Sequence, residues 1–190
     1  LSPYPRRGLE LLVHTGICDI VLPEVSALQD TVDEHRRHKD VYEHTLTVVQ
    51  QAMDLETGPD GDVPGPDLRL RLAALLHDIG KPATRRFMPD GTVTFHAHDY
   101  VGARMTAKRM RALHFDKQTI KDVSRLVELH LRFHGYADSP WSDSAVRRYV
   151  TDAGPLLARL GCLTRADVTT GNRRKAAMLS HAYDDLERRI

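Results

Sequence analysis

The apolar run at residues 68–79 constrains the fold of this chain more than any other segment. Its leucine, alanine and isoleucine residues occupy nearly every face of the helix that they would form. A helix that is apolar all round belongs in the centre of a fold, because it has no face left for solvent. Asp67 is a favourable N-cap before the run, and Gly80 and Pro82 end it. The sequence therefore predicts a buried central helix over residues 68–79.

The remainder of the chain is predicted to be helical around this segment, with one exception. Two short runs that favour β-structure flank the turn signature Pro89-Asp90-Gly91, so residues 85–95 are expected to form a small β-hairpin. The other expected helices cover residues 8–13, 41–56, 98–113, 117–132, 142–151, 155–170 and 173–189, with breaks at Gly135, Pro140, Gly154-Pro155 and Gly171. The predicted fold class is all-α, a helical bundle with one small β-hairpin near residues 85–95.

Length and composition limit the classes of protein to consider. A chain of 190 residues can form one well-cored domain, and its net charge of +1 gives no general attraction to nucleic acid or membrane. Cys18 and Cys162 stand far apart without a CxxC motif, which favours a reducing compartment over a disulfide framework. No apolar run approaches the roughly 18 residues of a membrane span, and no signal peptide is visible. We therefore expect a cytoplasmic protein with no membrane partner.

The chain contains 11 histidines, and the helix faces on which they lie carry the functional argument. Residues three, four or seven positions apart share a helix face. His77, for example, shares its face with Leu70 and Ala74. Five side chains that can bind metals have apolar neighbours at these spacings: His44, His77, His98, His130 and Asp167. These side chains are therefore predicted to point into the core from separate helices.

Convergence of such groups favours a metal site over isolated core histidines. One inward histidine usually has a hydrogen-bonded partner, but each buried polar group without a partner costs about 2 kcal/mol or more. Asp78, adjacent to His77, adds a second carboxylate. A shared divalent cation satisfies all of these groups, and the mixture of imidazole and carboxylate suits Mn, Ni, Fe, Co or Zn. Adjacent helical residues point about 100° apart, so a wider cavity would let Asp78 bridge two ions.

The ordered set of His44, His77-Asp78-Ile79-Gly80-Lys81 and Asp167 resembles the HD phosphohydrolase superfamily, in particular its HDIG branch. The resemblance implies that His44, His77, Asp78 and Asp167 ligate one metal ion. It implies that His98 and His130 hold a second ion, with binding of the substrate phosphate as the alternative. Asp78, Lys81 and His130 are expected to act in catalysis, in which metal-activated water attacks phosphorus. Lys81 would contact the phosphate, or else only cap the preceding helix.

A narrower resemblance covers nearly the whole chain. Arg7-Gly8-Leu9-Glu10-Leu11, Asp40-Val41-Tyr42-Glu43-His44-Thr45, Leu75 to Pro82, Phe95-His96-Ala97-His98 with Gly102-Ala103, and Leu163-Thr164-Arg165-Ala166-Asp167 are similar to the C-terminal portion of bacterial CCA-adding tRNA nucleotidyltransferases, with the actinobacterial type nearest. The resemblance implies a neck-like helical lead-in at residues 1–32, an HD domain at 33–170 and a C-terminal helix at 171–190. It also implies hydrolysis of 2′,3′-cyclic phosphates or nucleotides, with a phosphorylated nucleotide or RNA end as substrate.

Two alternative functions remain open at this point. One is a freestanding HD nucleotidase or cyclic-dinucleotide phosphodiesterase, and the other is a non-catalytic, metal-stabilised module that binds tRNA. A start at Leu1 fits a cut within the neck, and the nucleotidyltransferase head is not recognisable, so this chain alone is not expected to add nucleotides. Basic stretches could contact tRNA phosphates or form solvated helix faces. They are Arg36-Arg37-His38-Lys39, Arg85-Arg86, Arg104 to Arg111, and Arg173-Arg174-Lys175.

The remaining histidines have weaker arguments. His96 precedes its helix by two residues and competes with His98 as a ligand. His38 and Asp40, one turn before His44, would line the entrance of the site or lie on the surface. No functional role is assigned to His14, His35, His114, His134 and His181, which are expected to lie on the surface or behind the ligands.

Overall fold

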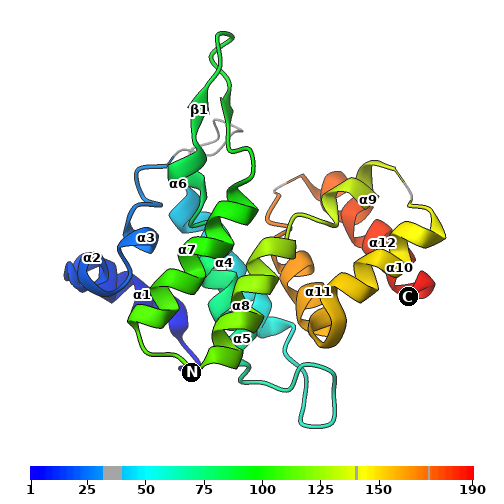
Figure 1. Ribbon diagram of the computed structural model, residues 1–190, viewed down its shortest axis with the longest axis horizontal. Coiled ribbons are helices and arrows are strands. Elements are labelled where there is room, and N and C mark those ends of the chain that lie inside the picture. Colours follow the sequence, from blue (N-terminus) through cyan, green and yellow to red (C-terminus); the bar gives the residue numbers. More distant parts are fainter. Residues whose placement is uncertain (32–39, 140, 171) are drawn as a thin grey trace.

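The computed structural model describes residues 1–31, 40–139, 141–170 and 172–190. Most of these residues form helices, and one small β-hairpin projects from the helical body (Figure 1). The predicted fold class is confirmed. The N-terminal helices lie at one side of the molecule in this view and the C-terminal helices at the other, with the helices of the middle of the chain between them (Figure 1).

The elements of the described residues have the following bounds. The first half contains α1 (Pro5–His14), α2 (Ile17–Val21), α3 (Pro23–Ser26), α4 (Val41–Asp54), α5 (Leu68–Leu76), α6 (Lys81–Thr84), β1 (Arg86–Phe87) and β2 (Val93–Thr94). The second half contains α7 (His98–Ala112), α8 (Lys117–Leu129), α9 (His134–Asp138), α10 (Asp143–Ala153), the 3-10 helix η1 (Gly154–Leu156), α11 (Leu157–Ala166) and α12 (Arg173–Arg189).

Helix α5 is the buried centre of the bundle, as its apolar sequence predicts. It packs against α4, α8 and α11. Leu70, Ala73 and Leu76 are at most 1% exposed. The predicted N-cap is confirmed, because the Asp67 carboxylate accepts a hydrogen bond from the backbone N–H of Leu70 at 2.8 Å. Each of these three helices also carries or precedes a candidate ligand, so the apolar packing brings these ligands toward one point.

The central helix ends three residues earlier than predicted. It stops at Leu76, and His77 is its C-cap. A continued helix would place the Pro82 ring against the carbonyl of Asp78, four residues before it. The chain instead tightens into turns, in which the N–H of Ile79 bonds Leu76 O and the N–H of Lys81 bonds Asp78 O, and Pro82 sits in the first turn of α6. His77 and Asp78 therefore lie at a helix end rather than inside a helix.

The predicted hairpin is present. Strands β1 and β2 pair antiparallel, with Arg86 opposite Thr94 and Phe87 opposite Val93. Gly91 has a φ of 79°, in the left-handed region that glycine adopts without strain, and its N–H closes the turn on Met88 O. The hairpin extends away from the helices (Figure 1), and the Phe87 side chain at its edge is exposed.

Two predictions about the C-terminal half were wrong in detail. Gly135 was expected to break a helix, but it lies inside the short helix α9. Tyr136 packs its ring against Phe133 and Trp141, so α9 is stabilised by tertiary contacts that local periodicity does not reveal. The helix predicted over residues 155–170 is divided into η1 and α11, and α11 ends at Ala166.

The predicted division into three segments remains a prediction. Its first boundary, between residues 32 and 33, lies outside the described residues, and its second lies beside residue 171, which is also outside them. The described helices include none that combines the length and the apolar character needed to cross a lipid bilayer.

Candidate metal centre

The candidate ligands come from five separate places in the sequence, and most lie at helix ends. His77, Asp167 and His130 are the C-cap residues of α5, α11 and α8. His98 is the first residue of α7, whereas His44 lies within α4. The C-terminal end of a helix carries a partial negative charge from its free carbonyls. Three such ends meet at this point, which makes the site favourable for a cation before any carboxylate is considered.

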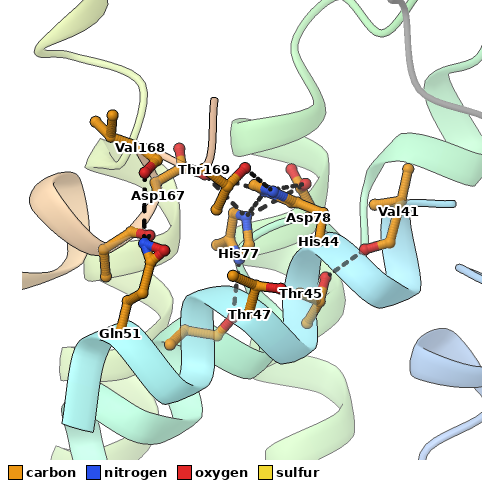
Figure 2. A network of polar contacts seen from close by, with 12 residues as sticks. Val41, His44, Thr45, Thr47, Gln51, His77, Asp78, Asp167, Val168 and Thr169 are labelled. Carbon is orange, nitrogen blue, oxygen red and sulfur yellow. Dashed lines mark hydrogen bonds and ion pairs between the residues drawn. The ribbon is translucent and has the colours of Figure 1, made fainter. Parts of the chain in front are cut away.

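Four of the candidate side chains form a close cluster (Figure 2). The Nε2 atom of His44 lies 3.0 Å from Asp167 Oδ1 and 3.5 Å from Asp78 Oδ2. The Nε2 atoms of His44 and His77 are 3.2 Å apart. Nε2 of His77 lies 3.2 Å from Asp78 Oδ2 and 3.5 Å from Asp167 Oδ1. The convergence predicted from helix faces is therefore present in the structure.

These separations match the geometry of ligands around one ion. Nitrogen and oxygen ligands bind zinc at about 2.0–2.2 Å, so neighbouring ligand atoms of a tetrahedral or octahedral centre lie about 3.0–3.5 Å apart. The distances within the cluster span 3.0 to 3.5 Å. The donor set of two imidazoles and two carboxylates also suits a transition metal. The residues present therefore fit a metal ion.

Asp78 joins this cluster to a second group. Its Oδ2 faces His44 and His77, and its Oδ1 lies 3.2 Å from His98 Nε2. Ligand atoms of Asp78, His98 and His130 all lie within 4.8 Å of one another. The His130 Nε2 atom is buried and has no hydrogen-bond partner among the described residues. A buried nitrogen of this kind, beside a carboxylate, is the observation expected at a second cation position.

Three of the imidazoles are held in the tautomer that metal ligation requires. The Nδ1 atoms of His77, His98 and His130 lie 2.8, 2.8 and 2.6 Å from backbone carbonyl oxygens three residues earlier. A carbonyl only accepts hydrogen bonds, so Nδ1 must carry the hydrogen. The Nε2 lone pair then points into the site. Such a contact on the remote nitrogen is typical of metal-binding histidines.

Charge in the site reinforces this arrangement. Burial lowers the pKa of His77, but the charges and hydrogen bonds of Asp78 and Asp167 outweigh burial and raise that pKa to about 10. Burial would raise the pKa of both carboxyl groups, yet the neighbouring histidines keep the pKa of each well below its usual range. Burial and the charge of His77 together lower the pKa of His130 to about 4. The site therefore favours positive charge between the carboxylates and leaves His130 neutral.

Lys81 and Gly80 complete the wall beside Asp78. The Lys81 Nζ lies 2.9 Å from Asp78 Oδ2 and 5.6 Å from the centre of the Phe95 ring. Gly80 is in close contact with α7, since a Cβ atom there would lie 2.1 Å from His98 O and 2.7 Å from Gly102 N. This approach of backbone to backbone sets the distance between Asp78 and His98.

The other predicted residues lie elsewhere. His96, the rival of His98, is exposed and does not belong to either candidate metal group. Asp40 accepts a hydrogen bond from Glu43 N at 2.7 Å as the N-cap of α4, rather than projecting into the site. His14, His114, His134 and His181 are exposed, as expected. His35, His38 and the basic stretch at residues 36–39 lie outside the described residues.

The basic residues of α7 differ in their surroundings: some are exposed, and one forms an ion pair with another helix. Arg104, Lys108 and Arg111 are exposed on the helix surface. Arg109 instead pairs with Glu24 at 2.9 Å and holds α7 against α3. At the other end of the molecule, Arg173, Arg174 and Lys175 are exposed in the first turn of α12.

Two residues of the site were not found from the sequence. Thr169 Oγ1 lies 2.9 Å from His44 Nδ1, and the Gln51 amide donates hydrogen bonds to the carbonyls of Ala166 and Val168 on either side of Asp167 (Figure 2). The position of Gln51, seven residues after His44, was the available signal, because it places both side chains on one face of α4.

The sequence matches a known family, described as HD domain, over residues 41–172. It is 35% identical to the A-adding tRNA nucleotidyltransferase of Deinococcus radiodurans, covering 87% of this chain and 36% of that protein. It is 34% identical to the CC-adding tRNA nucleotidyltransferase of Thermus thermophilus, covering 98% of this chain and 41% of that protein. The chain therefore spans well under half the length of these curated relatives. The matches confirm the predicted resemblance to HD domains and to bacterial tRNA nucleotidyltransferases, whereas a nearest likeness to the actinobacterial type stays a prediction.

Proposed function

We infer that this chain, which belongs to the HD domain family, is a metal-dependent phosphohydrolase that acts on phosphate esters. The observation that carries the inference is the convergence of buried imidazole and carboxylate groups whose lone pairs meet at one point. His77 and Asp78 are at most 2% exposed there, and Asp167 is 14% exposed. Solvent does not satisfy the innermost groups, whereas a divalent cation would.

Each candidate residue then has a defined role. His44, His77, Asp78 and Asp167 would hold one ion, and Asp78, His98 and His130 would hold a second. Mn, Ni, Fe, Co and Zn all suit this donor set. Ions held here would supply Lewis acidity and lower the pKa of water, which is the chemistry that hydrolysis of a phosphate ester requires.

The residues around the ligands would bind and orient the phosphate. Lys81 places a cation next to Asp78, where a phosphate oxygen of the substrate would sit beside the site. His130, kept neutral by burial, presents Nε2 either to the second ion or to a phosphate oxygen. Asp78, Lys81 and His130 are therefore the residues that we expect to act in catalysis.

The relatives suggest the class of substrate. Two of them are described as A-adding and CC-adding tRNA nucleotidyltransferases. We propose that this chain is the HD domain of such an enzyme and hydrolyses a 2′,3′-cyclic phosphate or nucleotide at an RNA end. The exposed basic side chains of α7 and of the first turn of α12 are the surfaces that we expect to contact tRNA phosphates.

The test is hydrolysis by the purified chain after chelation and reloading with Mn²⁺, Ni²⁺ or Co²⁺. Bis(4-nitrophenyl) phosphate and 2′,3′-cyclic AMP are the substrates, and elemental analysis reports the bound metal. We expect turnover that depends on added metal. We expect Asp78→Asn to reduce kcat/KM at least about 100-fold, since residues that only support ligands already contribute 10–100-fold.

Asp60→Ala is the matched control, because Asp60 is an exposed carboxylate in the loop before α5. It should retain wild-type turnover and metal content. If the wild-type chain binds metal but hydrolyses none of the phosphoesters, the result would instead favour the non-catalytic module that binds tRNA.

A further inference from the structure

The segment that follows α11 carries Asp167 into the site, and α4 holds it at two points. The helix ends at Ala166, so the last carbonyls of α11 have no helical N–H to pair with. The Gln51 side-chain amide donates hydrogen bonds from Nε2 to the backbone oxygen of Ala166 at 3.1 Å and to that of Val168 at 3.4 Å. Asp167 is therefore flanked on both sides by backbone groups that a single side chain fixes (Figure 2).

The second point of attachment is the hydroxyl of Thr169. Its Oγ1 lies 2.9 Å from Nδ1 of His44, on the side of the ring that faces away from the other ligands (Figure 2). His44 and Gln51 are seven residues apart and share one face of α4. One helix face therefore contacts the segment 166–169 twice, once through Gln51 and once through His44, which also pairs with Asp167.

We propose that Gln51 and Thr169 are positioning residues for the metal centre, a role that rests on the function proposed above. Gln51 fixes the backbone of Asp167, and Thr169 fixes the ring of His44, so that the two ligand atoms stay 3.0 Å apart. In this role the Thr169 oxygen would accept the Nδ1 hydrogen, which would leave the Nε2 lone pair of His44 for an ion. It thereby does for His44 what backbone carbonyls do for the other three imidazoles.

The experiment measures Co²⁺ affinity and the visible absorption spectrum of the Co²⁺-loaded chain, which reports the geometry of its ligands. Gln51→Met keeps the length of the side chain but removes both hydrogen bonds. We expect Co²⁺ to bind about 10-fold or more weakly, with an altered spectrum, as is typical when an outer contact of a metal site is lost. Gln50→Met is the matched control, because the Gln50 amide donates its hydrogen bond to Asp54 on the same helix.

Thr169 provides an independent pair of variants. Thr169→Val removes the hydroxyl with little change in shape and should weaken Co²⁺ binding to a similar degree. Thr169→Ser retains the hydroxyl and should restore both affinity and spectrum. Circular dichroism of the metal-free chains shows whether each variant folds, and if Gln51→Met does not fold, the Thr169 pair decides alone.

The outcomes separate this proposal from the one on which it rests. A wild-type chain that binds no Co²⁺ would overturn the metal centre itself. A wild-type chain that binds Co²⁺, together with folded Gln51→Met and Thr169→Val chains of unchanged affinity and spectrum, would overturn only the positioning roles. A purely structural role would lower thermal stability in the metal-free state and leave affinity and spectrum unchanged.

Discussion

The chemistry of this site depends on which nitrogen of each histidine carries a hydrogen. His77, His98 and His130 all bond a backbone carbonyl three residues earlier through Nδ1. For His77 and His130 this carbonyl belongs to the last turn of a helix, which leaves its carbonyls unpaired, whereas for His98 it is that of Phe95, just before α7 begins. The C-terminal ends of α5 and α8 also direct their negative dipole toward the site. For His77 and His130, ligand orientation and local field therefore have one cause, which is the position of each histidine at the C-terminal end of a helix.

Because His130 belongs only to the second group of ligands, we expect that its removal prevents binding of the second ion and spares the first. His130→Ala deletes a ligand of the second group only, so it should reduce the metal content from two ions to one per chain while the first site keeps its affinity. His134→Ala is the control, because His134 is exposed in α9. Isothermal titration with elemental analysis measures both quantities. A His130→Ala chain that still binds two ions would contradict the assignment.

At Gly80, we expect the addition of a single methyl group to lower the free energy of unfolding strongly. A Cβ there would lie 2.1 Å from the backbone oxygen of His98, and backbone cannot move aside as a side chain can. Gly80→Ala should therefore cost about 3 kcal/mol in the free energy of unfolding. It should also weaken metal binding, because α7 and His98 must shift. In Gly8→Ala the new methyl group meets no atom within 4 Å, so denaturant titration should show no loss of stability.

Single residues also show where sequence reasoning ends. The inward direction of His44, His77 and His130 could be predicted, because each shares a helix face with apolar neighbours. Thr169 could not, because it lies beyond the end of α11 and no periodicity gives the path of the chain there. Its contact with His44 joins residues that are 125 positions apart in the sequence.

At the level of elements, helix interiors were predicted better than helix ends. The buried helix α5 was expected from its composition, and its N-cap Asp67 from the type of residue. Its end at Leu76 was missed because apolar character continues to Ile79, whereas the steric demand of Pro82 acts four residues earlier. Helix α9 was missed because it has only five residues and depends on the aromatic packing of Tyr136.

Asp40 is the N-cap of α4, and its loss is expected to lower stability measurably. The Asp40 carboxylate accepts the N–H of Glu43 at 2.7 Å, one turn before His44. Asp40→Ala should lower the free energy of unfolding by about 1 kcal/mol. For a chain of this size, the melting temperature should fall by about 2–4 °C. Asp40→Asn keeps an acceptor at the cap and should melt near the wild type, and equal losses in the two variants would exclude the cap as the cause.

For the whole molecule, the position of the site follows from the packing order. Helix α5 contacts α4, α8 and α11, and these helices carry or precede His44, His130 and Asp167. The apolar faces of the bundle therefore determine where the polar groups meet. This explains why a sequence with an ordinary content of charge could still be expected to contain one concentrated polar centre.

The same packing makes the stability of the whole chain depend on metal. An ion that binds the folded chain and not the unfolded one stabilises it by about 4 kcal/mol when its concentration is 1,000 times the dissociation constant. For a chain of this size, that corresponds to a rise in melting temperature of roughly 8–16 °C. We expect differential scanning calorimetry to show this rise when Mn²⁺ or Ni²⁺ is added to the chelated chain. Asp167→Asn, which removes one carboxylate charge from the ligand cluster, should show a much smaller rise. A wild-type chain that binds metal with an unchanged melting temperature would mean that its ions bind the unfolded chain equally well, and the buried cluster would then not be their site.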